Sequence, residues 1–393
     1  MLPSLALLGA LSADPEIVVY TMGPGEHLFE RFGHAAICVE ERLRARCYNY
    51  GTTDFETPPQ KIGWEFIRGN SRFWVSVWPK ERMLRAYVAS DRDVYRQVLP
   101  LDREQKLRVI GLLESDSREE NRYYHYHHFD DNCTTRIRDV VDRATSGRFL
   151  QGADVSAGVT RRELGAQGLG EWPLAVALGQ VFAGPRLDQD MSLREAMFLP
   201  RYLRSELESK LGAKVERVSR RRGVPFPSQA PRTWPSFAGL AGLLTLPLVL
   251  SRRSPRGARA AVLLTGLVLG AVGSALWLMS VLARMQELRM NQALLLFWPT
   301  DLALGVLRRG ARGSYARLRA LTALCVLTLS LMGVLEQPLE VPALVVLLPL
   351  GWLGWSTIGA ERRPFAKLAK HGFGSRKAAE TPPVAERKIK RFQ

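Results

Sequence analysis

Two residues far apart in this 393-residue chain, Cys133 and His34, have the side chains that nucleophilic acyl transfer requires. After Cys133 the apolar residues Ile137, Val140 and Val141 recur at helical spacing, which predicts an amphipathic helix that begins at the cysteine. The free amides and the dipole of a helix N-terminus favour a thiolate over a thiol. A thiolate beside an imidazole can attack a carbonyl, so we predict Cys133 as nucleophile and His34 as its base.

The residues just before the cysteine bear on its reactivity in two opposite ways. Asp131 or Asn132 is suited to cap the predicted helix, and the amide of Cys133 points toward the place where an oxyanion would form. The negative charges of Asp130 and Asp131 oppose a low pKa of the thiol. The sequence leaves this conflict open.

The histidine opens a segment with the alternating pattern of a β-hairpin, residues 34–39 and 46–50. With the turn at residues 42–43, Cys38 faces Cys47 across the two strands. A compartment outside the cytoplasm permits a disulfide between them. Two buried free thiols are the alternative.

The same register places Asn49 opposite Ala36 and diagonal to His34, on the face of the hairpin that His34 shares. From there the amide of Asn49 can orient the imidazole, so Asn49 is our candidate for the third member of the site. Asp54, shortly after the hairpin, is the second choice.

A histidine-rich stretch raises the alternative of a metal site. His125, His127, His128 and Asp130 precede Cys133 closely, and side chains of these types ligate zinc. Adjacent strand positions point to opposite faces, however, and the sequence has no second pair of ligands elsewhere. We therefore predict no metal and no cofactor.

The elements that position these residues belong to a chain of two unlike halves. The first has the composition of a soluble domain and is long enough to bury a core, whereas the second consists of apolar runs separated by arginine-rich breaks. We predict a signal segment at 1–13, an extracytoplasmic thiol acyl-transfer domain at 14–222, a proline-rich linker at 223–235, a transmembrane domain at 236–360 and a basic cytoplasmic tail at 361–393. The formal net charge of +17 does not predict nucleic-acid binding, because much of the excess lies in the breaks and the tail.

Five apolar stretches are predicted to cross the membrane: residues 234–251, 260–282, 293–307, 320–335 and 341–358. The breaks after the first and the third stretch contain several arginines and no acid, which is typical of cytoplasmic loops. We expect a multi-pass protein of the bacterial inner membrane, with a periplasmic N-terminal domain and a cytoplasmic C-terminus. Asp301, in the third stretch, is the one acid inside a predicted span and marks either a functional site or the edge of that span.

Several motifs together resemble a known family: Phe32-Gly33-His34-Ala35-Ala36, Tyr48-Asn49-Tyr50-Gly51, Asp131-Asn132-Cys133-Thr134-Thr135-Arg136 and Met197-Phe198-Leu199-Pro200. The chain resembles the lipoprotein N-acyltransferases of the Bacteroides type, in which a periplasmic domain precedes a helical membrane domain. The order of histidine and cysteine is also similar to that of circularly permuted papain-like enzymes such as the NlpC-like hydrolases. The resemblance implies an α+β fold, a circularly permuted papain-like (NlpC-like) domain followed by an all-α bundle of about five transmembrane helices.

The resemblance also implies a reaction. Cys133 would attack an ester of a membrane phospholipid, and the α-amino group of the lipidated N-terminal cysteine of a bacterial lipoprotein would take the acyl chain from the thioester. His34 would accept the proton of the thiol and later a proton of the amine. Two alternatives are a cell-wall or protein cysteine hydrolase, an amidase or peptidase with the same pair, and a non-catalytic membrane scaffold.

Overall fold

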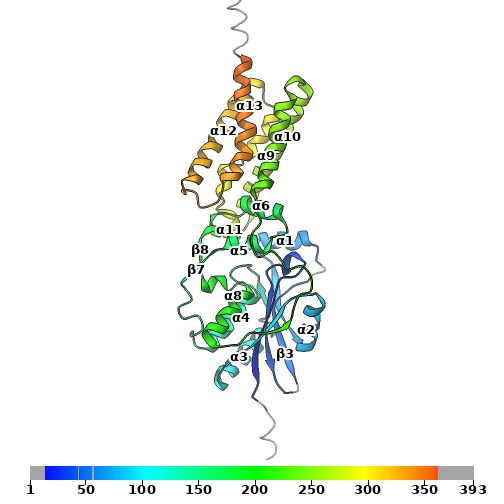
Figure 1. The fold of residues 1–393 in the computed structure, drawn as a ribbon, viewed down its shortest axis with the longest axis vertical. Coiled ribbons are helices and arrows are strands. Elements are labelled where there is room, and N and C mark those ends of the chain that lie inside the picture. Colours follow the sequence, from blue (N-terminus) through cyan, green and yellow to red (C-terminus); the bar gives the residue numbers. More distant parts are fainter. Residues whose placement is uncertain (1–13, 43, 55–56, 362–393) are drawn as a thin grey trace, which may run out of the picture.

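The computed structural model describes residues 14–42, 44–54 and 57–361. The predicted signal segment and all but the first residue of the predicted basic tail lie outside these residues. A sheet domain and a bundle of long helices are stacked along the long axis of the molecule, with a layer of short elements between them (Figure 1). The mixed sheet and helix domain followed by apolar helices agrees with the α+β class.

The N-terminal domain is built on one seven-stranded antiparallel sheet with the order β6-β4-β3-β2-β1-β5-β9. Its strands are β1 (Glu16–Met22), β2 (His34–Glu40), β3 (Ala45–Thr52), β4 (Arg72–Pro79), β5 (Val94–Val98), β6 (Tyr123–His125) and β9 (Glu216–Ser219). The inner strands β1 and β2 are buried on both faces, because side chains alternate along a strand and helices cover each side of the sheet.

Different helices cover the two faces of the sheet (Figure 1). On one face α4 (Cys133–Ala144) packs with α3 (Arg103–Asp116) and α8 (Pro200–Leu211) over a core that includes Ile37 of β2. On the other face α2 (Lys80–Ala89) packs over a smaller cluster that includes Ala36. The amphipathic pattern predicted after Cys133 is therefore confirmed, since its apolar side chains face this sheet.

The β2–β3 hairpin has the predicted register, with Cys38 opposite Cys47. The two cysteines form a disulfide, so the alternative of two free thiols is not realised. The disulfide fits an oxidising compartment outside the cytoplasm. The ladder ends one pair before Ala36 and Asn49, so that expected pair is not part of it.

The layer between the sheet and the bundle holds short elements that contact both (Figure 1). They are α1 (Pro59–Ile67), β7 (Ser156–Thr160), α5 (Arg161–Gly168), α6 (Pro173–Phe182), η2 (Pro185–Asp188), β8 (Asp190–Ser192), α7 (Leu193–Ala196) and α11 (Gln286–Arg289). Hydrogen bonds join this layer to the segments that flank the bundle helices, among them Gln180 Nε2 to Pro338 O at 2.7 Å and Arg284 N to Ile67 O at 3.1 Å.

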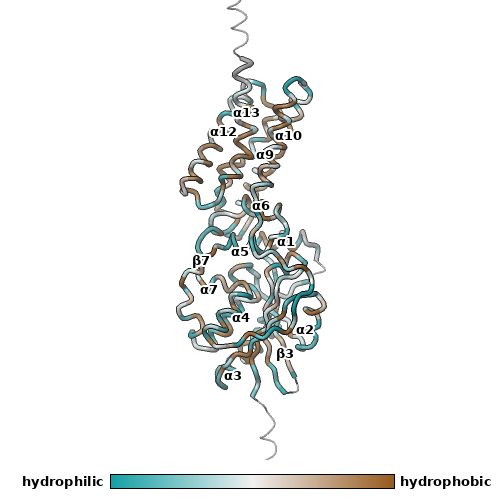
Figure 2. Tube along the Cα trace, in the orientation of Figure 1, coloured by the Kyte–Doolittle hydropathy of each residue, from teal (hydrophilic) through white to brown (hydrophobic). Residues whose placement is uncertain are grey.

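The bundle contains α9 (Trp234–Leu250), α10 (Pro255–Leu282), α12 (Arg309–Leu331) and α13 (Glu340–Glu361), and hydrophobic residues predominate along these helices (Figure 2). Among the described residues three helices are long and apolar enough to cross a membrane, Trp234–Arg253, Pro255–Leu282 and Arg309–Leu331. The apolar part of α13 that can be assessed, Glu340–Ser356, is shorter. Of the about five membrane helices predicted, three are therefore clear candidates among the described residues.

The third predicted stretch, residues 293–307, is not an α-helix. It forms two short 3-10 helices, η4 (Gln292–Leu295) and η5 (Pro299–Gly305). Glycines of α10 allow this segment to approach closely, since a Cβ atom on Gly273 would lie 2.5 Å from the carbonyl carbon of Trp298. Hydropathy detects that the stretch is apolar, but it carries no information on whether the backbone is α-helical.

A buried ion pair holds η5 in place. Asp301 of η5 and Arg319 of α12 are both fully buried. Arg319 donates from Nε and Nη2 to the two carboxylate oxygens of Asp301 at 2.9 Å each. Nη2 also donates to the backbone oxygen of Leu296 at 2.6 Å, and Tyr315 donates to Asp301 at 2.8 Å. In an apolar layer non-helical backbone persists only where such partners satisfy it.

Candidate active site

Cys133 is the first residue of α4, and Asn132 caps the helix. The side-chain oxygen of Asn132 accepts from the amides of Thr134 and Thr135 at 2.8 and 2.9 Å. Its amide nitrogen donates to two backbone carbonyls of separate segments, so the cap also fixes the helix start within the domain. Of the two predicted caps, Asn132 is the one that the structure uses.

The environment of Cys133 favours the thiolate. The residue is only 8% exposed, and this burial raises the pKa of its thiol. The charge of His34, hydrogen bonding with that side chain, the amide of Ala35 and the hydroxyl of Thr134 act in the opposite direction, and the resulting pKa is about 7 instead of the ordinary 9.0. A substantial fraction of the thiol is therefore ionised at neutral pH.

The structure resolves the conflict over the acidic residues before the cysteine. Asp131 forms a two-bond ion pair with Arg136, whose Nη2 lies 2.7 Å from Oδ2. Asp130 turns toward His127, whose Nδ1 accepts from the Asp130 amide at 3.1 Å. Because Arg136 offsets the charge of Asp131, this carboxylate does not prevent ionisation of the thiol.

His34 is the first residue of β2, and its imidazole stacks on the ring of Tyr87 with centroids 5.7 Å apart and planes 26° apart. The guanidinium of Arg92 lies over the same tyrosine ring, 5.1 Å from its centroid. Nε2 of His34 is buried and has no hydrogen-bond partner among the described residues. No local motif marks Tyr87 or Arg92, because α2 and the loop after it bring them to the histidine only through packing on the sheet.

The two candidates for a third member lie as follows. Asn49 is buried, and its Nδ2 donates to the backbone oxygen of Cys47 at 3.3 Å. Asp54 is exposed and accepts from the hydroxyl of Thr57 at 3.1 Å. Neither of these contacts involves His34, so a role for Asn49 or Asp54 in orienting the imidazole stays a prediction.

A tyrosine hydroxyl that the sequence did not single out lies close to Cys133. A Cβ atom on Gly51 would lie 3.5 Å from Cβ of Cys133 and 3.8 Å from the hydroxyl of Tyr124. That hydroxyl is buried and has no hydrogen-bond partner among the described residues. Burial, followed by the nearby charge of Cys133, raises the pKa of Tyr124 well above its ordinary value. The group therefore keeps its proton and can donate a hydrogen bond.

The histidine-rich stretch does not assemble the zinc site weighed from the sequence. His125 is exposed on β6, and the ring of His128 packs against Phe129. One group of three metal-type donors occurs among the described residues, His127, Asp130 and Glu287, and it does not include Cys133. Within this group His127 and Glu287 form an ion pair, with Nε2 of His127 3.6 Å from the Glu287 carboxylate of α11.

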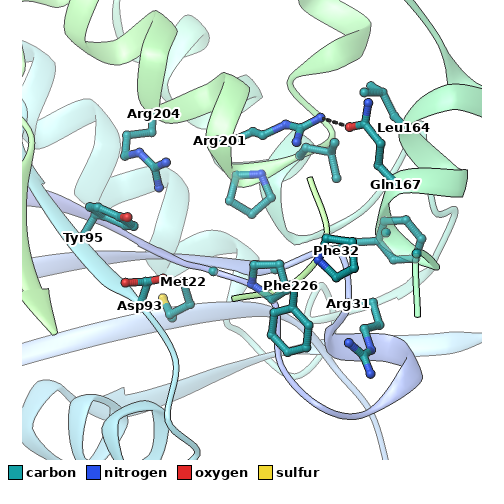
Figure 3. A pocket seen from close by; sticks show the side chains of 18 of the residues that line it. Met22, Arg31, Phe32, Asp93, Tyr95, Leu164, Gln167, Arg201, Arg204 and Phe226 are labelled. Carbon is teal, nitrogen blue, oxygen red and sulfur yellow. Dashed lines mark hydrogen bonds between the residues drawn. The ribbon is translucent and has the colours of Figure 1, made fainter. Parts of the chain in front are cut away.

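A cavity of about 230 Å³ borders the segment that leads into His34 (Figure 3). Phe32 and Gly33, the two residues before the histidine, form part of its wall. Charged side chains contribute much of the rest, among them Arg31, Asp93 and Arg204, as Figure 3 shows. Apolar side chains, among them Leu164 and Phe226, line it as well, so the cavity has a mixed lining.

Comparison with known proteins agrees with the resemblance read from the motifs. Residues 11–165, which contain both His34 and Cys133, match the family model of the Lnb N-terminal periplasmic domain. No curated protein and no solved structure matches the chain, so the circularly permuted papain-like arrangement stays a prediction. A periplasmic domain followed by apolar helices long enough to cross a bilayer indicates a protein of the inner membrane. The family that the motifs around the histidine and the cysteine predicted is thus the one whose model matches residues 11–165.

Proposed function

We propose that this protein is a lipoprotein N-acyltransferase. It moves a fatty acyl chain from a membrane phospholipid, through a thioester on Cys133, to the α-amino group of the lipidated N-terminal cysteine of a bacterial lipoprotein. The observation that carries this proposal is a buried thiol at the start of α4, with the side chain of His34 and the amide of Ala35 beside it, in a periplasmic domain that a layer of short elements joins to the apolar helices.

The first half of the reaction forms the thioester. His34 takes the proton of Cys133, and the thiolate attacks the ester carbonyl of the phospholipid. The oxyanion accepts hydrogen bonds from the Cys133 amide and, in our proposal, from the hydroxyl of Tyr124. The carbon–oxygen bond of the ester then breaks, His34 returns the proton to the leaving oxygen, and a lysophospholipid departs.

The second half transfers the chain to nitrogen. The neutral α-amino group of the acceptor attacks the thioester carbonyl, and His34 accepts the proton that the amine loses. The carbon–sulfur bond breaks, the new amide leaves, and the cysteine is restored. Burial of Cys133 limits the access of water, which favours transfer to the amine over hydrolysis of the thioester.

The position of the site relative to the bundle supports a lipid donor. The loop that leads to Cys133 contacts α11, the first helix after α10, through His127 and Glu287. Large apolar side chains are exposed on the elements at this end of the domain, including Trp64 of α1 and Leu174 of α6. Aromatic and apolar groups at this level suit a membrane surface. A donor lipid can then reach the thiol without leaving the bilayer.

We also propose five crossings, with the non-helical segment from Asn291 to Arg308 as the third. The side chain of Asn291 donates a hydrogen bond to Val181, in the layer between the sheet domain and the bundle. Arg312, just after this segment, lies close to Arg259 at the opposite end of the bundle. Both arginine-rich breaks therefore share one end of the bundle. The positive-inside rule makes that end cytoplasmic, so that the C-terminus is also cytoplasmic.

Mass spectrometry of a lipoprotein N-terminal peptide tests the proposed reaction. The full chain is expressed in a host that lacks its own N-acyltransferase, with the Cys133→Ala variant as the control. We expect one additional amide-linked acyl chain on the peptide with the wild type only. Cleaved wall peptides with an unchanged lipoprotein would instead indicate a hydrolase, and equal products from both proteins would indicate a scaffold.

A further inference from the structure

The imidazole of His34 is held by a stack of rings rather than by a chain of polar side chains. Tyr87 of α2 stacks on it with ring centroids 5.7 Å apart, and the guanidinium of Arg92 lies over the same tyrosine ring, 5.1 Å from its centroid. Tyr87 therefore contacts both His34 and Arg92, and we call these three side chains the stack.

The last member of the stack is firmly fixed. Arg92 is 2% exposed, its Nε donates to the backbone oxygen of Gly23 at 2.9 Å, and its Nη1 lies 3.8 Å from Glu30. A buried guanidinium with these contacts has little freedom to move, and its positive charge attracts the face of the tyrosine ring. Arg92 thereby holds Tyr87 at the position that supports the imidazole.

At Nε2 the imidazole lacks the polar partner that a third residue supplies in many thiol enzymes, because this atom is buried without a hydrogen-bond partner among the described residues. The side-chain amide of Asn49 donates to the backbone oxygen of Cys47 instead. Offset ring stacking restricts the orientation of a planar side chain without using either of its nitrogens.

We propose that Tyr87, backed by Arg92, is the positioning residue of the catalytic histidine, and that its aromatic ring rather than its hydroxyl carries this role. The inference rests on the proposed Cys133–His34 pair and adds how that pair is oriented. The charged groups that face the stack are Cys133, Arg92 and Glu30. With the ring removed, the imidazole turns away from the sulfur for part of the time, and the thiolate loses its main source of stabilisation.

The rate of alkylation of Cys133 by iodoacetamide, measured against pH on the full chain in detergent, tests this inference. Tyr87→Phe keeps the ring, Tyr87→Leu removes it, and Val88→Ala, an exposed neighbour on the same helix, controls for disturbance of α2. Cys325→Ala in all proteins leaves Cys133 as the one free thiol among the described residues.

We expect Tyr87→Phe and Val88→Ala to match the wild type. Tyr87→Leu should raise the inflection of the pH profile and slow alkylation at pH 7 by roughly threefold to tenfold, the range for loss of one aromatic stack. An unchanged profile for Tyr87→Leu, or an equal loss in Tyr87→Phe, would overturn the inference. A wild-type thiol without a low inflection would instead contradict the proposed function, so the two failures are distinguishable.

Discussion

Two pairs of ionisable side chains, one in the bundle and one in the sheet domain, differ in how completely their hydrogen bonds are used. In the bundle, Asp301 and Arg319 form two hydrogen bonds with each other and further bonds with Leu296 and Tyr315. In the periplasmic domain, the pair of Cys133 and His34 leaves Nε2 of the histidine without a hydrogen-bond partner in the described part of the chain.

This difference separates a pair that stabilises the fold from a pair that can react. A buried polar group without a partner costs stability, so its persistence beside a thiol with a lowered pKa marks a place that a substrate completes. The Asp301–Arg319 pair has nearly all its bonds made, with only Nη1 of Arg319 unpartnered among the described atoms. We interpret the bundle pair as a structural brace and the domain pair as the reactive centre.

The largest expected effect comes from removing the reactive sulfur. Cys133→Ala should lower the rate of acyl transfer at least about a thousandfold, because no other group can form the thioester. The melting temperature should hardly change. Cys325→Ala, which removes the exposed cysteine of α12, is the matched control and should keep full activity. Comparable activity in the two variants would contradict the interpretation of Cys133 and His34 as the reactive pair.

The bundle pair should show the reverse behaviour. Asp301→Leu leaves Arg319 buried without its counter-charge and should destabilise the folded protein by about 3–5 kcal/mol. The double change Asp301→Leu with Arg319→Met should recover much of that loss, since neither charge then remains buried. Thermal unfolding in detergent measures both. If the single variant is as stable as the double one, the pair is not a brace.

Removal of the imidazole should change the charge state of the thiol. Without His34, burial is the leading influence and raises the pKa of Cys133 from about 7 toward or above its ordinary 9.0. In His34→Gln the thiolate fraction at pH 7 should therefore fall by roughly fiftyfold. In the wild type this fraction rises with pH through about 7, and in the variant the rise should move upward. Thiol alkylation against pH measures the shift, and coincident profiles would refute it.

A smaller effect is expected at the tyrosine beside the nucleophile. Tyr124→Phe removes the proposed oxyanion donor and should slow acyl transfer by about tenfold to a hundredfold, with the alkylation rate of Cys133 unchanged. Tyr123→Phe, at the adjacent position on the other face of β6, is the matched control. Equal losses in both variants, or slower alkylation in Tyr124→Phe, would show that the hydroxyl acts through packing instead.

The sequence predicted the parts of the site that local patterns encode. The turn predicted at residues 42–43 implied the register that joins Cys38 to Cys47, and the structure has this register. The apolar spacing after Cys133 together with Asn132 predicted the start of α4. The stack of Tyr87 on His34 was missed, because it depends on how α2 packs against the far face of the sheet. Such contacts leave no periodic signal.

The error in the membrane region has a comparable cause. Residues 293–307 are apolar enough to resemble a membrane helix, but Pro299 begins a 3-10 turn and Arg319 supplies backbone partners from a distant helix. Hydropathy sums composition over a window and does not register such long-range hydrogen bonds.

The central claim is that the sulfur of Cys133 carries an acyl chain during the reaction. The full-length protein, incubated with phospholipid vesicles in the absence of any lipoprotein, is digested and analysed by mass spectrometry. The account predicts one fatty acyl adduct on the peptide that contains Cys133, removed by neutral hydroxylamine. Acyl transfer to an acceptor peptide in the same preparation, without any adduct on Cys133, would contradict it.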